Sequence, residues 1–253
     1  MRRLRFVLEY DGSEFAGWQI QPAERSVQGV LEEALREITG ESRRFSPAGR
    51  TDAGVHAVGQ VAHVDCATHL EVPALGRALN AVLPRDVAVQ ALEIAPSDFH
   101  ARHDASAKLY IYRILNRATP SPVRARFAWH LRSPLDVAAM AEAAASVVGT
   151  HDFSAFRGAP GGSDEEVSPR RTLHRLNVVA LGDEVRVEAE GRSFLRHMVR
   201  NLAATLVEIG QGRRPASEMA KVLESRDRAN AAPTAPAHGL CLERVRYPDR
   251  PVD

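Results

Sequence analysis

Apolar positions recur with two different periods along this chain, and the two periods predict strands and helices. From Leu4–Tyr10 every second residue is apolar, which predicts a strand that ends at the Asp11-Gly12 turn. After Ser26 the apolar residues instead fall three and four positions apart, until Gly40. This second pattern predicts an amphipathic helix with Ser26 as its N-cap and Gly40 at its C-terminal end.

The same two patterns continue to the end of the sequence. They predict further strands over about Val58–Cys66, Asp86–Ile94, Lys108–Asn116, Thr172–Ala180, Val185–Glu190 and Leu240–Arg246, and helices over about Pro73–Leu83, Pro134–Val148, Phe194–Gly210 and Pro215–Ser225. This order predicts an α+β protein of two βαβ-rich, ferredoxin-like or RNA-recognition-motif-like halves, residues 1–105 and 106–253, forming a largely antiparallel mixed sheet flanked by helices. The Gly-rich insert 157–169 is expected to be a surface loop or a plain connector.

Composition narrows the class of protein. Of 253 residues, 44% are hydrophobic and 26% are charged, which is typical of a globular protein. No apolar run approaches the roughly 18 residues of a membrane span, and the N-terminus does not read as a secretory signal, so we expect a cytoplasmic protein with no membrane partner. Cys66 and Cys241 lie far apart and are expected to be core residues.

The formal net charge is only +1, but the basic residues are unevenly distributed. Two of the 33 Lys and Arg residues are lysines, and arginine can bond phosphate bidentately and stack on bases. Basic residues gather in three clusters, at Arg124, Arg126, His130 and Arg132, at Arg170, Arg171, His174 and Arg175, and at Arg192, Arg196, His197 and Arg200. Locally basic surface on a neutral protein fits a shaped RNA site, although any one cluster also fits a solvated face.

The segment Gly49–Ala57 is the strongest candidate for chemistry. Asp52 stands in an Asp-Ala-Gly run that forms turns, because Gly54 can adopt positive φ without steric penalty. Arg50 lies two positions away, and a guanidinium within bonding reach would favour the ionised carboxylate of a nucleophile. The alternative is that Asp52 only caps its own turn while Arg50 is solvated.

Three further features are compatible with substrate binding. Arg196, His197 and Arg200 are expected in the first two turns of the helix from Phe194, where the helix dipole disfavours cations unless an anion lies there. Arg196 and Arg200 would share one helix face. Tyr110 and Tyr112 share a strand face, on which a tyrosine could stack on a base or belong to the core. His63, Asp65 and His69 do not complete a recognisable site, so no metal is expected.

These residues resemble the bacterial tRNA pseudouridine synthase A, or TruA, family over nearly the whole chain. The Gly49–Ala57 segment carries the resemblance, together with Glu9–Ser13, Phe15–Gln19, Phe99–Arg102, Tyr110, Phe194–Asn201 and Ala235–Leu240, in the family's order. The resemblance implies a pseudouridine synthase fold and the isomerisation of uridine to pseudouridine at positions 38, 39 and 40 of the tRNA anticodon stem-loop. It implies no cofactor and no metal, and a homodimer that holds tRNA across both subunits.

The resemblance also assigns roles to residues. Asp52 would be the nucleophile, attacking either C1′ of the ribose or C6 of the uracil, and Tyr110 would pack on the uracil. Arg50 and Arg200 would orient Asp52 and bind phosphate, and Arg196 and His197 would also be substrate-binding residues. The competing hypothesis is a non-catalytic RNA-binding protein with tandem RNA-recognition-motif-like domains, although the RNP1 pattern of that class is absent.

Overall fold

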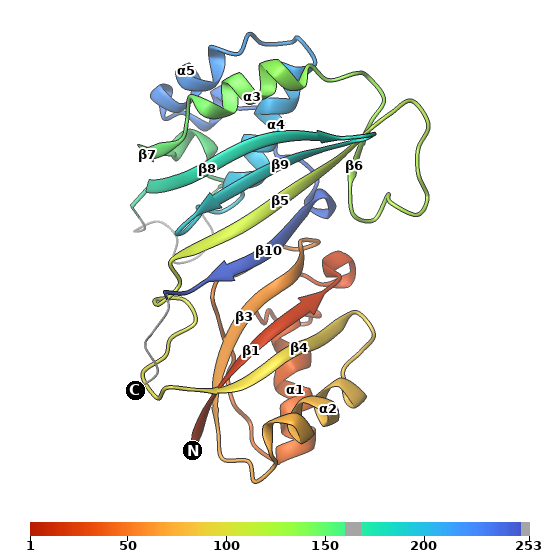
Figure 1. The fold of residues 1–253 in the computed structure, drawn as a ribbon, viewed down its shortest axis with the longest axis vertical. Helices are drawn as coiled ribbons and strands as arrows, with labels where there is room; N and C mark the ends of the chain where they lie inside the picture. The colour runs from red at the N-terminus through yellow and green to blue at the C-terminus, as the bar shows by residue number, and fades with distance from the viewer. Residues whose placement is uncertain (160–167, 249–253) are drawn as a thin grey trace. The chain divides into compact units, whose positions relative to one another are not determined.

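The computed structural model describes residues 1–159 and 168–248, so most of the insert expected to be a surface loop lies outside the described residues. The chain divides into two compact units, one formed by Met1–Ser106 together with the residues from Cys241 onward, the other by Ala107–Leu240. Each unit combines β-strands with helices, which confirms the predicted α+β class (Figure 1).

The first unit is a mainly antiparallel sheet with helices packed against it. Its elements are β1 (Arg2–Tyr10), α1 (Val27–Thr39), β2 (Ser46–Pro47), β3 (His56–Cys66), α2 (Val72–Val82), β4 (Val87–Ala95) and β10 (Leu240–Arg246). The strand order is β4-β1-β3-β10, with β2 paired to β3. β1 runs antiparallel to both β3 and β4, whereas β10 runs parallel to β3. The predicted strands and helices of this unit are confirmed to within a few residues.

Alternation along β1 creates the core of the first unit. Leu4, Phe6 and Leu8 are fully buried, and the residues between them are more accessible. α1 buries Leu31 and Leu35 from its apolar stripe. Its ends are those expected, because the Ser26 side chain accepts the Gly29 N–H and Gly40 adopts a left-handed φ of 74°.

The final strand was expected in the second half of the chain, but it pairs with the first unit. Cys241 and Leu242 of β10 lie opposite His56 and Ala57 of β3. Sequence patterns show that a segment is a strand without showing which strand it joins, because pairing partners can lie anywhere along the chain. Both cysteines are buried, as predicted.

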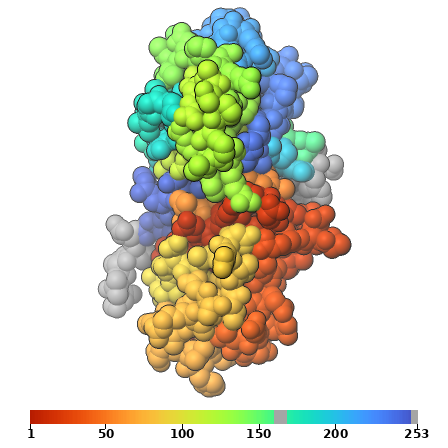
Figure 2. All heavy atoms as spheres, turned by 90° about the vertical axis from the view of Figure 1, so that its right-hand side faces the viewer, coloured from red at the N-terminus to blue at the C-terminus, as the bar shows by residue number. Residues whose placement is uncertain are grey.

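The second unit contains antiparallel strands packed with helices. It contains β5 (Ala107–Asn116), β6 (Trp129–Leu131), α3 (Val137–Ala145), β7 (Gly149–Asp152), β8 (Arg170–Leu181), β9 (Glu184–Gly191), α4 (Met198–Gly210) and α5 (Glu218–Ser225). The strand order is β5-β9-β8-β7, antiparallel throughout, and the short β6 pairs parallel to β5. The connection between β5 and β6 lies on the surface of this unit (yellow-green in Figure 2).

Several boundaries in the second unit differ from those predicted. α3 begins after Asp136, whose side chain accepts the Ala139 N–H, instead of at Pro134, and it ends at Ala145. The residues expected to continue that helix lead instead into β7, which starts at Gly149 with a φ of 119°. The Asp136 N-cap sets the start of this helix in preference to Pro134, because its side chain satisfies a backbone N–H that would otherwise lack a partner.

The buried His63 lies in an environment that disfavours its protonated form. The His63 Nδ1 atom accepts the Ala101 N–H, and its ring lies 4.7 Å from that of His100, centroid to centroid. Burial, aided by the positive charges of His100 and Arg3 and opposed by Asp65, lowers the pKa of His63 to about 4. The folded protein therefore holds His63 neutral at pH values where the unfolded chain would protonate it.

We expect His63 to contribute stability above pH 6.5 that is lost as the pH falls from 6.5 to about 4. The expected slope is at most about 1.4 kcal/mol per pH unit. Urea unfolding of wild type and His63→Asn between pH 7.5 and 4.5 checks this, because the asparagine oxygen can still accept the Ala101 N–H but does not titrate. His69→Gln, which alters an exposed histidine, is the control. Parallel stability curves for wild type and His63→Asn would contradict the prediction.

Candidate active site

Asp52 lies in a tight turn between β2 and β3, as the Asp-Ala-Gly run predicts. The Val55 N–H donates to the Asp52 carbonyl over 3.1 Å, and Gly54 adopts a φ of 75°. The preceding Thr51 is buried, and its hydroxyl lies 2.8 Å from the Tyr10 hydroxyl on β1. These bonds anchor both ends of the turn while Asp52 itself stays partly exposed.

A second chain segment, Phe15–Trp18, runs along the Asp52 turn. Gly17 and Asp52 form an isolated antiparallel bridge. Beside it the Trp18 N–H donates to Thr51 O over 3.0 Å, and the Gly54 N–H donates to Phe15 O over 3.2 Å. Backbone bonds therefore hold the aspartate from outside its own turn, which local sequence patterns did not reveal.

The beginning of the same loop fixes the other side of the turn. The Gly12 N–H donates to Nδ1 of His56 over 3.0 Å, and this atom lies 3.1 Å from the Asp11 carboxylate. A Cβ on Gly12 would lie 2.0 Å from the Val55 carbonyl oxygen, so only glycine fits there. His56 is buried and starts β3 immediately after the turn. Local sequence patterns did not reveal Asp11 or His56 as site residues.

Arg50 has an exposed side chain, and its expected bond to Asp52 stays a prediction. The neighbouring Thr51 is held inward by Tyr10, which leaves Arg50 on the outside of the chain.

The proposed uracil contact, Tyr110, belongs to β5 of the second unit. Its ring packs edge-on against Phe194, with the centroids 5.2 Å apart, and its residue is 7% exposed. Tyr112, on the same strand face, is fully buried, and its hydroxyl donates to Pro236 O over 2.8 Å. Tyr112 therefore has a structural role within the unit.

The basic residues before α4 are arranged differently from the prediction. The helix begins at Met198, and His197 precedes it with a left-handed φ of 59°. Arg196 is outside the helix, donating to Ala159 O, whereas Arg200 is in its first turn and its Nε donates to Ala235 O. The expectation that Arg196 and Arg200 share a helix face is wrong, because the His197 conformation breaks the helical path between them.

His63 and Asp65 both bond other groups of the protein. Asp65 forms a bidentate ion pair with Arg3, at 2.8 and 2.7 Å. In the part of the chain that the structure describes, no three His, Cys, Asp or Glu side chains are grouped to hold a metal ion. In the same part, no helix has the length and apolar character needed to cross a membrane.

The described geometry is that of a rigid carboxylate site. A partly exposed carboxylate is carried by a turn whose backbone is bonded on two sides, so the backbone position from which it projects is fixed before any substrate binds. Such an oxygen can act as a nucleophile or as a base, and preorganisation lowers the entropic cost of either step.

Comparison with known proteins identifies the class. The family model described as tRNA pseudouridine synthase matches residues 7–104 and 143–248. The chain is 50% identical to tRNA pseudouridine synthase A of Myxococcus xanthus, over 99% of this chain and 94% of the relative. It is 47% identical to that of Paramagnetospirillum magneticum, over 98% and 96%, and 44% identical to that of Brevibacillus brevis, over 98% and 100%.

The chain therefore belongs to the tRNA pseudouridine synthase A (TruA) family of isomerases, with the pseudouridine synthase fold. This confirms the resemblance noted in the sequence and the expectation of an enzyme. It also decides against the competing hypothesis of a non-catalytic RNA-binding protein.

Proposed function

We propose that this enzyme converts uridines 38, 39 and 40 of the tRNA anticodon stem-loop to pseudouridine, with Asp52 as the nucleophile. The observation that supports the nucleophile most directly is the turn itself, in which Gly17, Trp18 and Gly54 hold the backbone around a partly exposed Asp52. The substrate class follows the names of the relatives, which are tRNA pseudouridine synthases.

The proposed reaction is an isomerisation, so it needs no net reactant besides the tRNA. An Asp52 oxygen attacks either C1′ of the ribose or C6 of the uracil. In the first route the C1′–N1 bond breaks as the C1′–O bond forms, and the base leaves with the electron pair. The base then rotates, C5 attacks C1′ and expels the carboxylate. Finally C5 loses its proton and N1 gains one.

Chemistry at this position requires the target nucleotide to leave its stack. We assign Tyr110 to pack on the uracil, and Arg50, Arg196, His197 and Arg200 to contact the RNA, with phosphate as the target of the arginines. Because Arg50 is exposed, it fits the role of binding phosphate better than the role of orienting Asp52. We further propose a homodimer that holds one tRNA across both subunits.

The proposed positions can be tested with transcripts that lack one target uridine at a time. Tritium at C5 is released only when C5 forms the new glycosidic bond, so release counts the isomerised uridines. We expect release from transcripts carrying C5-tritiated uridine to fall stepwise when uridine 38, 39 or 40 is replaced by cytidine, and to vanish when all three are replaced. Replacement of a uridine in the acceptor stem is the control. Unchanged release from the triple replacement would refute the positions.

A further inference from the structure

Arg25 forms an ion pair and a ring contact at the end of the loop that follows β1. Its Nη1 and Nη2 atoms donate to the two carboxylate oxygens of Asp86, over 2.7 and 2.8 Å. The guanidinium carbon also lies 4.0 Å from the centroid of the Phe15 ring. A bidentate pair combined with a cation–π contact fixes both the position and the plane of the guanidinium.

Phe15 connects this arrangement to Asp52 through the backbone. The Ala16 N–H donates to Arg25 O, and the Phe15 carbonyl accepts the Gly54 N–H of the Asp52 turn. On its other edge the Phe15–Trp18 segment accepts hydrogen bonds from the start of α1, from Val27 to Gly17 O and from Gln28 to Trp18 O. The segment is thus held between the turn and the helix.

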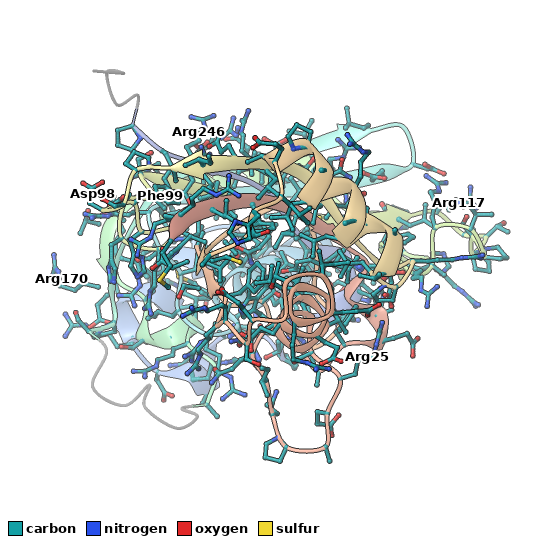
Figure 3. The ribbon with its side chains drawn as sticks, turned by 90° about the horizontal axis from the view of Figure 1, so that it is seen from below. Arg25, Asp98, Phe99, Arg117, Arg170 and Arg246 are labelled. Atoms are coloured by element: carbon teal, nitrogen blue, oxygen red, sulfur yellow. The ribbon has the colours of Figure 1, made fainter. Side chains whose placement is uncertain are left out.

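Asp86 bonds both ends of the loop between β1 and α1. Its carbonyl accepts the Asp11 N–H over 3.0 Å at the beginning of the loop, and its carboxylate holds Arg25 at the end. Between these points residues 20–25 are exposed on the surface of the first unit (red in Figure 2), and Arg25 lies beside α1 (Figure 3). The Gln21 side chain also anchors the loop by donating to Ala16 O over 3.1 Å, and the Arg25–Asp86 pair adds the ion pair between the end of the loop and the turn before β4.

We infer that Arg25 and Asp86 are positioning residues for Asp52, acting through Phe15 to hold the Phe15–Trp18 segment against the catalytic turn. The inference rests on the proposed role of Asp52 as nucleophile. It assigns a function in catalysis to an ion pair that touches none of the reacting atoms.

The other role for an arginine with a side chain 38% exposed is a direct contact with RNA phosphate. The geometry favours positioning, because both terminal nitrogens already bond Asp86 and the guanidinium lies over Phe15. The two roles differ in what removal of Asp86 should do. Loss of the carboxylate releases the segment if Arg25 is a positioning residue, but it frees a cation for RNA if Arg25 binds phosphate.

The test compares Arg25→Gln, Asp86→Asn and the double variant in steady-state tritium release. We expect each single variant to lower kcat about tenfold, since small displacements of a catalytic group cost rate, with KM for tRNA within twofold of wild type. The double variant should be no worse than either single one, because the pair acts as a unit. Arg25→Lys, which keeps the charge but loses the bidentate geometry, should recover kcat only in part.

Backbone amide exchange supplies a readout independent of turnover. The Trp18 and Gly54 N–H groups should exchange faster in Arg25→Gln and Asp86→Asn than in wild type. The matched control is Arg5→Gln. Arg5 forms a similar ion pair with Glu93, and its guanidinium carbon lies 4.8 Å from the Tyr247 ring centroid. Arg5→Gln should change neither kcat nor the exchange of these two amides.

Two results would overturn the inference. One is a raised KM in Arg25→Gln that Arg25→Lys restores fully and Asp86→Asn does not share, which would assign Arg25 to phosphate binding. The other is unchanged kcat and unchanged amide exchange in both single variants. Retained turnover by Asp52→Asn would instead refute the nucleophile, and the exchange measurement would still report whether the pair holds the turn.

Discussion

Replacing Asp52 with asparagine should abolish pseudouridine formation and leave tRNA binding intact. The amide has nearly the shape of the carboxylate but is a very poor nucleophile, so the covalent step cannot begin. The turn should survive, because its bonds to Gly17, Trp18 and Gly54 involve the backbone. We expect kcat below about one thousandth of the wild-type value. Carbodiimide adduct mapping of treated transcripts and tritium release both measure this loss.

Glu24→Gln is the matched control for that variant. It makes the same change from carboxylate to amide at an exposed position of the neighbouring loop. It should retain wild-type kcat, and both variants should bind tRNA and unfold at the wild-type midpoint. Turnover by Asp52→Asn above the background of a no-enzyme reaction would refute the assignment of the nucleophile.

Gly17→Ala should impair both stability and catalysis. Gly17 has a φ of 105°, which side-chain-bearing residues rarely adopt, and a Cβ would lie 2.7 Å from Thr51 O. Relief of that contact requires the backbone bridged to Asp52 to move. We expect a loss of about 1–3 kcal/mol in the free energy of unfolding. We also expect kcat to fall at least about tenfold, because the carboxylate is displaced. Urea unfolding and tritium release measure the two effects.

Gly40→Ala separates backbone strain from displacement of the site. Gly40 also has a positive φ, 74°, but nothing lies within 4 Å of where its Cβ would be. It should cost about 1 kcal/mol of stability and leave kcat unchanged. If Gly17→Ala lost stability to the same degree and kept wild-type kcat, the Phe15–Trp18 segment would not set the direction of Asp52.

Local patterns predicted most regular elements well. β1, α1 and β10 needed only periodicity and caps, since alternation, Ser26 and Gly40 act within a few residues. The starts of α3 and α4 were misplaced because a competing cap at Asp136 and a left-handed His197 depend on local backbone geometry that propensity does not show. The two- to four-residue strands β2, β6 and β7 were missed, because they form only where a partner strand is available.

The sequence by itself determined the α+β class, the family and the turn that carries Asp52, because each depends on residues close together or on a motif present in order. Only the tertiary structure decided what holds that turn. It left Arg50 exposed, placed Gly17 against Asp52, and joined Arg25 to Asp86, 61 positions away. Contacts between distant segments follow from how the chain packs, and no local periodicity encodes them.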